Sequence, residues 1–262
     1  MAATGGYPLL LDRWDAAASG AENVLSLTSD ALSPLVVNAS TLLLDLPDAD
    51  GFRRTLNAIG RGATRHSEIT NHAGQRIDRT LAYLERAGFV QRVTPVGEGR
   101  QHAPHHELAD TYLSFWYAVV ERDLQLIDGG QGRAAIERAM PRWLTHLGSV
   151  FEAEARRHLE RLVAEGRLPS GSVVGRWWTH RPRQVEIDPV AVTGTTWSVA
   201  GEAKWADELA AWDLRRLRQQ LNVIGKRAER SQLAFWARRG YSPDFVAAAG
   251  DALRFTADDL LS

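Results

Sequence analysis

Two neighbouring apolar segments in the second half of this chain carry acids and a lysine in a spacing suited to phosphodiester chemistry. Asp188 lies on the first segment, and the triplet Glu202-Ala203-Lys204 lies on the second. Because side chains alternate between the two faces of a strand, Glu202 and Lys204 would share one face while Ala203 points to the other. The pattern therefore predicts a site at which a divalent cation and a lysine act on the same phosphate.

Metal chemistry explains why these residue types belong together. Mg²⁺ and Mn²⁺ prefer carboxylate oxygens, so Asp188 and Glu202 are predicted metal ligands. Lys204 would stand beside the attacking water, where its charge favours hydroxide and stabilises negative charge on the phosphate. Glu152, on a helix expected ahead of the strands, is the predicted third metal ligand. The predicted catalytic set is therefore Asp188, Glu202, Lys204 and Glu152, with Mg²⁺ or Mn²⁺ as cofactor.

A simpler alternative is an exposed strand face that carries a weak ion pair between Glu202 and Lys204. The spacing of the three residues alone does not separate the two interpretations. The residues around them are strongly apolar, which places the charges near a buried sheet and favours a functional site.

Two other segments have basic faces and are predicted to contact nucleic acid. A long helix expected over residues 206–230 would bind phosphates through Arg215, Arg216 and Arg218. Earlier in the chain, a helix with Ile77, Leu81 and Leu84 on its inner side would present Gln75, Arg76 and Arg79 to a DNA groove. A solvated helix face and a protein-contact module are the respective alternatives.

The elements that must position these residues divide the chain into three parts. Residues 1–49 are predicted to be an interrupted helical segment, 50–106 a winged helix-turn-helix, and 107–262 an α/β sheet domain with helices on both faces. The fold class is accordingly α+β or α/β. The sheet domain is expected to contain a helix over about residues 147–164, strands over 172–178, 184–192 and 196–203, and a further strand over 232–237.

Composition limits the function classes. Net charge is −1, so affinity for nucleic acid must come from local patches rather than from overall charge. The chain has no cysteine, which excludes disulfides and zinc–thiolate sites and fits a cytoplasmic location. No apolar run is long enough to span a membrane. The sequence contains no phosphate-binding loop motif, so nucleotide binding is not expected. His102, His105 and His106 are expected in a surface loop rather than in a zinc site.

The ordered motifs resemble the C-terminal part of archaeal-type AAA+ ATPases, in which an ATPase module precedes a winged helix and a PD-(D/E)XK nuclease-like domain. The resemblance covers nearly the whole chain and is carried by residues 5–11, 56–62, 68–69, 113–117, 148–152, 177–178, 186–188 and 201–205. One departure from the family pattern is Pro189, which follows Glu-Ile-Asp where an aliphatic residue is usual. Proline there is expected to bend the strand or mark a sheet edge.

The resemblance implies that Asp188, Glu202 and Lys204 form the nuclease-like triad, with Glu152 as the helix acid. It implies a restriction-endonuclease-like fold for the sheet domain, with residues 1–49 as a remnant of the ATPase lid region. DNA is the expected partner, with RNA as a further substrate, and either a separate ATPase or self-association would complete the system. The alternative is a non-catalytic DNA-binding or adaptor protein that retains the nuclease fold.

Overall fold

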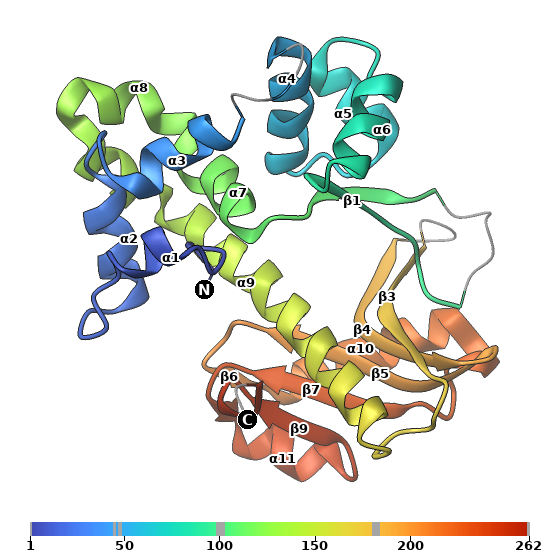
Figure 1. Ribbon diagram of the computed structural model, residues 1–262. Coiled ribbons are helices and arrows are strands. Elements are labelled where there is room, and N and C mark those ends of the chain that lie inside the picture. Colours follow the sequence, from blue (N-terminus) through green and yellow to red (C-terminus); the bar gives the residue numbers. More distant parts are fainter. Residues whose placement is uncertain (1, 44–45, 47–48, 98–102, 180–183, 261–262) are drawn as a thin grey trace. The chain divides into compact units, whose positions relative to one another are not determined.

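The computed structural model describes residues 2–43, 46, 49–97, 103–179 and 184–260 (Figure 1). The chain forms two compact units, one from residues 1–93 and 104–147 and the other from residues 94–103 and 148–262. The predicted mixed class is confirmed, because N-terminal helices and one long helix precede a five-stranded mixed sheet with its own helices. In the described part of the chain, no helix is both long and apolar enough to cross a bilayer.

The first unit is built around an aromatic helical segment. Tyr112, Phe115 and Trp116 are buried, as their helical spacing predicts, and the Trp116 indole donates a hydrogen bond to the Val36 carbonyl at 2.8 Å. The surrounding elements are α1 (Pro8–Leu11), α2 (Gly20–Thr28), α3 (Pro34–Leu42), α7 (Thr111–Phe115), η1 (Trp116–Val120), η2 (Glu121–Asp123), α8 (Leu124–Leu126) and η3 (Ile127–Gln131). The N-terminal helices therefore share one hydrophobic core with the helices that follow Asp110.

Three helices and a pair of antiparallel strands lie in the region for which a winged helix-turn-helix is predicted. They are α4 (Ala49–Gly60), α5 (His66–Ala73), α6 (Asp78–Arg86), and the antiparallel strands β1 (Val90–Val93) and β2 (His105–Leu108). Ile77, Leu81 and Leu84 are buried, as expected. Gly74 ends α5 at a φ of 66°, a backbone conformation that glycine adopts without steric cost.

The prediction that the histidines lie in a surface loop is wrong for His105 and His106. His105 and His106 begin β2 and are buried, and Nδ1 of His106 lies 3.0 Å from the Glu85 carboxylate. Strand pairing with β1 draws them inward, which the run of three histidines did not reveal. His102 lies outside the described residues.

The long helix α9 (Gly132–Ala164) has 33 residues and begins well before the predicted start near Leu147. Local helix propensity is low at Pro141 and Gly148, both of which lie inside α9. Buried residues Ile136, Ala139 and Trp143 instead continue one apolar stripe through the region, and tertiary packing outweighs the cost of an internal proline. Glu152 thus lies on the second half of one continuous helix.

The second unit contains a five-stranded sheet in the order β3-β4-β5-β7-β9. Strands β3 (Val173–Thr179), β4 (Val185–Thr193) and β5 (Thr196–Lys204) are antiparallel neighbours, whereas β7 (Gln232–Ala237) and β9 (Leu253–Thr256) continue the sheet in parallel. The parallel step from β5 to β7 needs a crossover, which α10 (Ala211–Ile224) supplies. The remaining elements are η4 (Gly225–Arg227), α11 (Pro243–Ala249) and η5 (Asp258–Leu260).

Helix α10 is shorter than the predicted 206–230. Glu208 and Leu209 instead form β6, a short strand paired with β8 (Gly240–Tyr241), and Gly225 ends the helix at a φ of 75°. Apolar residues of α9 and α10 pack in two separate clusters with the sheet. Phe151, Ala155, Leu159 and Leu162 of α9 pack with Val199 and Ala203, whereas Leu214 and Leu217 of α10 pack with Ile187, Val190 and Ala200.

Pro189 does not mark a sheet edge, because β4 lies between β3 and β5. The register between β3 and β4 shifts at this point, with Trp177 opposite Ile187 and Gly175 opposite Val190. The irregularity accommodates a proline, which has no amide proton to donate to a neighbouring strand.

Candidate functional site

The predicted residues meet where β4 and β5 separate. Asp188 stands directly opposite Glu202 in the antiparallel register. Beyond this pair, among the described residues, β4 continues to pair with β3, through Ile187 and Trp177, and β5 continues to pair with β7, through Lys204 and Ala237. The β4–β5 ladder therefore ends at the two carboxylates, whose side chains are 9% and 10% exposed.

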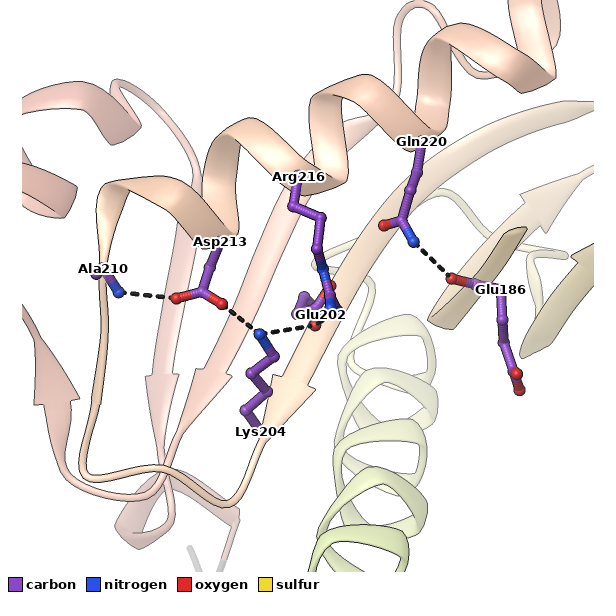
Figure 2. Close-up of polar contacts among 7 residues, drawn as sticks. All are labelled: Glu186, Glu202, Lys204, Ala210, Asp213, Arg216 and Gln220. Carbon is purple, nitrogen blue, oxygen red and sulfur yellow. Dashed lines mark hydrogen bonds and ion pairs between the residues drawn. The ribbon is translucent and has the colours of Figure 1, made fainter. Parts of the chain in front are cut away.

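The alternation of side chains on β5 is the one predicted from its sequence. Ala203 packs in the apolar cluster with Phe151 of α9, whereas Glu202 and Lys204 contact side chains of α10 (Figure 2). The acid and the lysine are neighbours, with Lys204 Nζ 3.5 Å from Glu202 Oε1. The strand thus presents both charges on the α10 side.

We call the charged residues between β5 and α10 the α10 cluster: Glu202, Lys204, Asp213 and Arg216. Arg216 forms an ion pair with Glu202, and Lys204 forms one with Asp213. In Figure 2, Asp213 and Arg216 project from successive turns of α10 toward β5. Asp213 also accepts a hydrogen bond from the Ala210 backbone amide at 2.9 Å, at the helix N-terminus where an acid is favoured.

The α10 cluster contains two carboxylates and two cations, and its acids are the more buried partners. The Asp213 and Glu202 side chains are 4% and 10% exposed, whereas Arg216 is 43% exposed. Burial raises the pKa of Glu202, and Arg216 and Lys204 oppose that shift by favouring the charged form. Burial outweighs these two cations, so the net shift in the pKa of Glu202 is upward.

A second group, the α9 cluster, comprises Glu152, Arg156 and Asp188. Arg156 forms an ion pair with Asp188, whose side chain is 9% exposed. Burial and the neighbouring Asp188 charge raise the pKa of Glu152 to about 8, against the lowering effect of Arg156. Glu152 is thus largely protonated at neutral pH, and the ion pair holds only one of the two acids in its charged form.

The structure brings the predicted residues into one region but not into a closed set of ligands. Glu152 and Asp188 interact on the α9 side, whereas Glu202 and Lys204 interact on the α10 side. Across the ranges that the model describes, no three His, Cys, Asp or Glu side chains are grouped so that they could hold a metal ion. The Asp188 carboxylate forms an ion pair with Arg156, and the Glu202 carboxylate forms one with Arg216.

Sequence reasoning missed Asp213, Arg156 and Trp212, all of which contact the predicted residues. Asp213 had a weak signal, since it is the third residue of α10, where acids are common. Arg156 lies one helical turn after Glu152 and so shares its face of α9. Trp212 had no signal, because its contact with Lys204 depends on where α10 begins.

Gly201 precedes the acid-x-lysine triplet and is tightly enclosed. A Cβ atom there would lie 2.7 Å from a ring carbon of Trp236, 3.0 Å from the Ala234 carbonyl oxygen and 3.1 Å from the Pro189 carbonyl oxygen. The crowding leaves no room for a side chain on the α9 side of β5 at this point.

The residues predicted to contact nucleic acid differ in their exposure and in their position on the helices. Arg215, Arg216 and Arg218 are exposed on α10. Gln75 and Arg76 precede α6 rather than lying on it, because the helix begins at Asp78, and Gln75 donates a hydrogen bond to the Gly51 carbonyl at 3.1 Å. Arg76 and Arg79 remain exposed. The surface near α6 therefore offers Arg76 and Arg79 to a ligand, whereas the Gln75 side chain is hydrogen-bonded to the backbone of the same unit.

Comparison with known proteins gives a limited relationship. Residues 116–217 match the model of the DUF234 family, described as archaea bacterial proteins of unknown function. An uncharacterized protein of Methanocaldococcus jannaschii is 28% identical over 176 residues, which cover 65% of this chain and 39% of that protein. The chain thus aligns with about two fifths of the relative's length. None of the solved structures matches it.

Proposed function

We propose that this chain hydrolyses phosphodiester bonds in nucleic acid with the help of Mg²⁺ or Mn²⁺. The observation that carries the proposal is the pairing of Asp188 with Glu202 at the end of the β4–β5 ladder, with Lys204 beside Glu202. Directly opposite residues of antiparallel strands have Cβ atoms about 4.5–5.5 Å apart. Because Asp188 contacts Arg156 on the α9 side and Glu202 contacts Arg216 on the α10 side, both carboxylates would have to turn toward the end of the ladder to share one ion. The resemblance to a nuclease-like domain supports the same residues in the same order.

The donor set suits a hard divalent cation. Asp188 and Glu202 would hold the ion, which stabilises charge on the phosphate when it is bound. The guanidinium groups of Arg156 and Arg216 already contact these carboxylates, so cation binding requires both arginines to withdraw. Glu152 would join the ligands only after losing its proton, since its pKa is about 8. Metal affinity should therefore rise with pH.

Lys204 and the two arginines then have roles toward the substrate. Lys204 is held by Asp213, which fixes its ammonium beside Glu202. A released Arg156 or Arg216 would be available to a phosphate, for which a guanidinium is a strong bidentate donor. The same cations would thus hold the carboxylates before binding and contact the scissile strand afterwards.

The test is cleavage of plasmid, single-stranded DNA and RNA with Mg²⁺ or Mn²⁺, using EDTA and Ca²⁺ as comparisons. We expect Asp188→Asn, Glu202→Gln and Lys204→Met each to lower the rate by about 100-fold or more, the size of loss seen when a group that stabilises transition-state charge is removed. Glu160→Gln and Lys226→Met are matched controls, because both residues are exposed in the second unit. Retention of cleavage in Asp188→Asn would contradict the site assignment.

A second candidate function is nucleic-acid binding without cleavage. It is favoured by the ion pairs that neutralise Asp188 and Glu202 and by the absence, within the described ranges, of a three-ligand group for a metal. It predicts steeply salt-dependent binding and no cleavage with any divalent ion. Under this function, Asp188→Asn would leave the affinity for nucleic acid nearly unchanged.

A further inference from the structure

An exposed tryptophan lies beside the α10 cluster. The Trp212 side chain is 50% exposed, near the start of α10. Lys204 Nζ lies 4.3 Å from the centre of its ring, and the Arg216 guanidinium carbon lies 5.5 Å from it. Large aromatic side chains usually bury more of their surface than this. The exposure of the indole beside two cations therefore suggests that it contacts a ligand.

The rest of the exposed α10 face is basic. Trp212, Arg215, Arg216 and Gln219 are all exposed, and their spacing of three, four and seven residues places them on one side of the helix. Asp213 is the one acid within Ala211–Ile224, and it is buried against Lys204. The face therefore combines an aromatic ring with positive charge and no exposed carboxylate.

We propose that this face binds single-stranded nucleic acid, with one base stacked on Trp212 and the adjoining phosphates at Arg215 and Arg216. Aromatic rings beside cations bind single strands because every base has a stacking face and the backbone is negative. Bases in a duplex are already stacked on one another and cannot reach the indole. The inference rests on the function proposed for the neighbouring carboxylates, and it names single strands as the substrate class.

The position of Trp212 connects the stacked base with the cleavage site. Lys204 contacts both the indole and Glu202, and Arg216 does the same. A strand anchored at Trp212 would therefore place a nearby phosphate within reach of both cations. The competing structural explanation is that the indole only shields the Lys204–Asp213 ion pair from water.

The two explanations differ in their response to an aliphatic replacement. Trp212→Leu keeps an apolar cover over the ion pair but removes the stacking surface, whereas Trp212→Phe keeps a smaller ring. Val246→Ala is the matched control, because Val246 is a similarly exposed apolar residue, 47% exposed, on α11. Each variant would first be compared with the wild type by thermal unfolding.

Binding would be measured on the full chain by fluorescence anisotropy in EDTA, with labelled oligothymidine, the same strand carrying abasic sites, and a duplex. We expect Trp212→Leu to weaken binding of oligothymidine by roughly 5- to 150-fold, which corresponds to about 1–3 kcal/mol for one stacked base. Trp212→Phe should recover most of the affinity, and Val246→Ala should match the wild type. With the abasic strand, Trp212→Leu and wild type should bind equally.

The proposal is overturned if the wild type does not prefer the single strand, or if Trp212→Leu binds oligothymidine as tightly as the wild type does. An equal loss on duplex would also overturn it, because the effect would then not come from base stacking. Because these measurements contain no divalent ion, they are separate from the cleavage test. Loss of stacking without any cleavage by the wild type would support this inference and refute the proposed hydrolysis.

Discussion

The α9 and α10 clusters stand on neighbouring strands but balance their charges differently. In the α9 cluster one guanidinium faces two acids, Asp188 and Glu152, and the pKa of Glu152 rises to about 8. In the α10 cluster two cations face two acids, and every acid has a cation in contact. Burial raises the pKa of both Glu152 and Glu202, and nearby cations oppose the shift in both clusters, Arg156 and Arg176 at Glu152 and Arg216 and Lys204 at Glu202.

The comparison also separates two roles within one predicted site. The α10 cluster is preorganised, since Asp213 holds Lys204 and is itself fixed by the Ala210 amide. The α9 cluster holds an acid that must lose a proton before it can serve a cation. Four substitutions would sharpen or break this contrast.

The largest effect is expected from removing the arginine of each cluster. Arg156→Met should lower the free energy of unfolding by about 2–4 kcal/mol, because it removes the ion pair that Arg156 makes with the buried Asp188 carboxylate. Arg216→Met should cost only about 1 kcal/mol, since Arg216 is 43% exposed and Lys204 remains 3.5 Å from Glu202. Urea unfolding at neutral pH measures both. Equal losses would show that the clusters do not differ in charge balance.

An intermediate effect is expected from Asp213→Asn. The change removes the negative partner of Lys204 and weakens the contact with the Ala210 amide, so unfolding should become easier by about 1–3 kcal/mol. Lys204 would also become more mobile, and cleavage should fall along with stability. Asp50→Asn at the start of α4 is a control, because Asp50 is exposed in the first turn of a helix in the other unit. A stable Asp213→Asn variant with unchanged cleavage would show that Lys204 needs no fixed partner.

At neutral pH the smallest effect is expected from Glu152→Gln, because Glu152 is largely protonated there, and the effect depends on pH. The pKa of Glu152 is raised from 4.5 to about 8 in the folded chain, so the folded state binds more protons than the unfolded state between these values. Stability should therefore fall as pH rises through this window, by about 4 kcal/mol from this group. Glu152→Gln cannot ionise and should lessen the fall. Unfolding in EDTA at pH 5 and pH 8.5 measures it, and an unchanged pH slope would contradict the assignment.

The sequence predicted the strands and the orientation of side chains on β5, because strict alternation is a local property. The two-residue repeat of a strand alone predicted that Ala203 points to one face of β5 and that Glu202 and Lys204 point to the other. The carboxylate partners could not be predicted in the same way. Arg156 and Arg216 come from helices on different sides of the triplet in the chain, and their contacts depend on tertiary packing.

Helix boundaries were the weakest part of the prediction, for a related reason. The start of α9 at Gly132 depends on apolar contacts made across Pro141, and local propensity does not include them. At α10, the residues from Glu208 to Ala210 leave the helix because Glu208 and Leu209 pair with Gly240 and Tyr241, which are distant in the chain. Contacts distant in sequence thus decided which residues stand next to the acids.

The enclosed position of Gly201 has a consequence for mutational tolerance and for the detection of related sites. Alanine at this position cannot be accepted alone, because Trp236 and the strands on both sides fill the space that a methyl group would need. A saturation library should recover substitutions at Gly201 only together with a smaller residue at position 236. In a sequence profile the glycine should therefore count as part of the motif, so that glycine-acid-x-lysine is a more selective search pattern than the acid and the lysine alone.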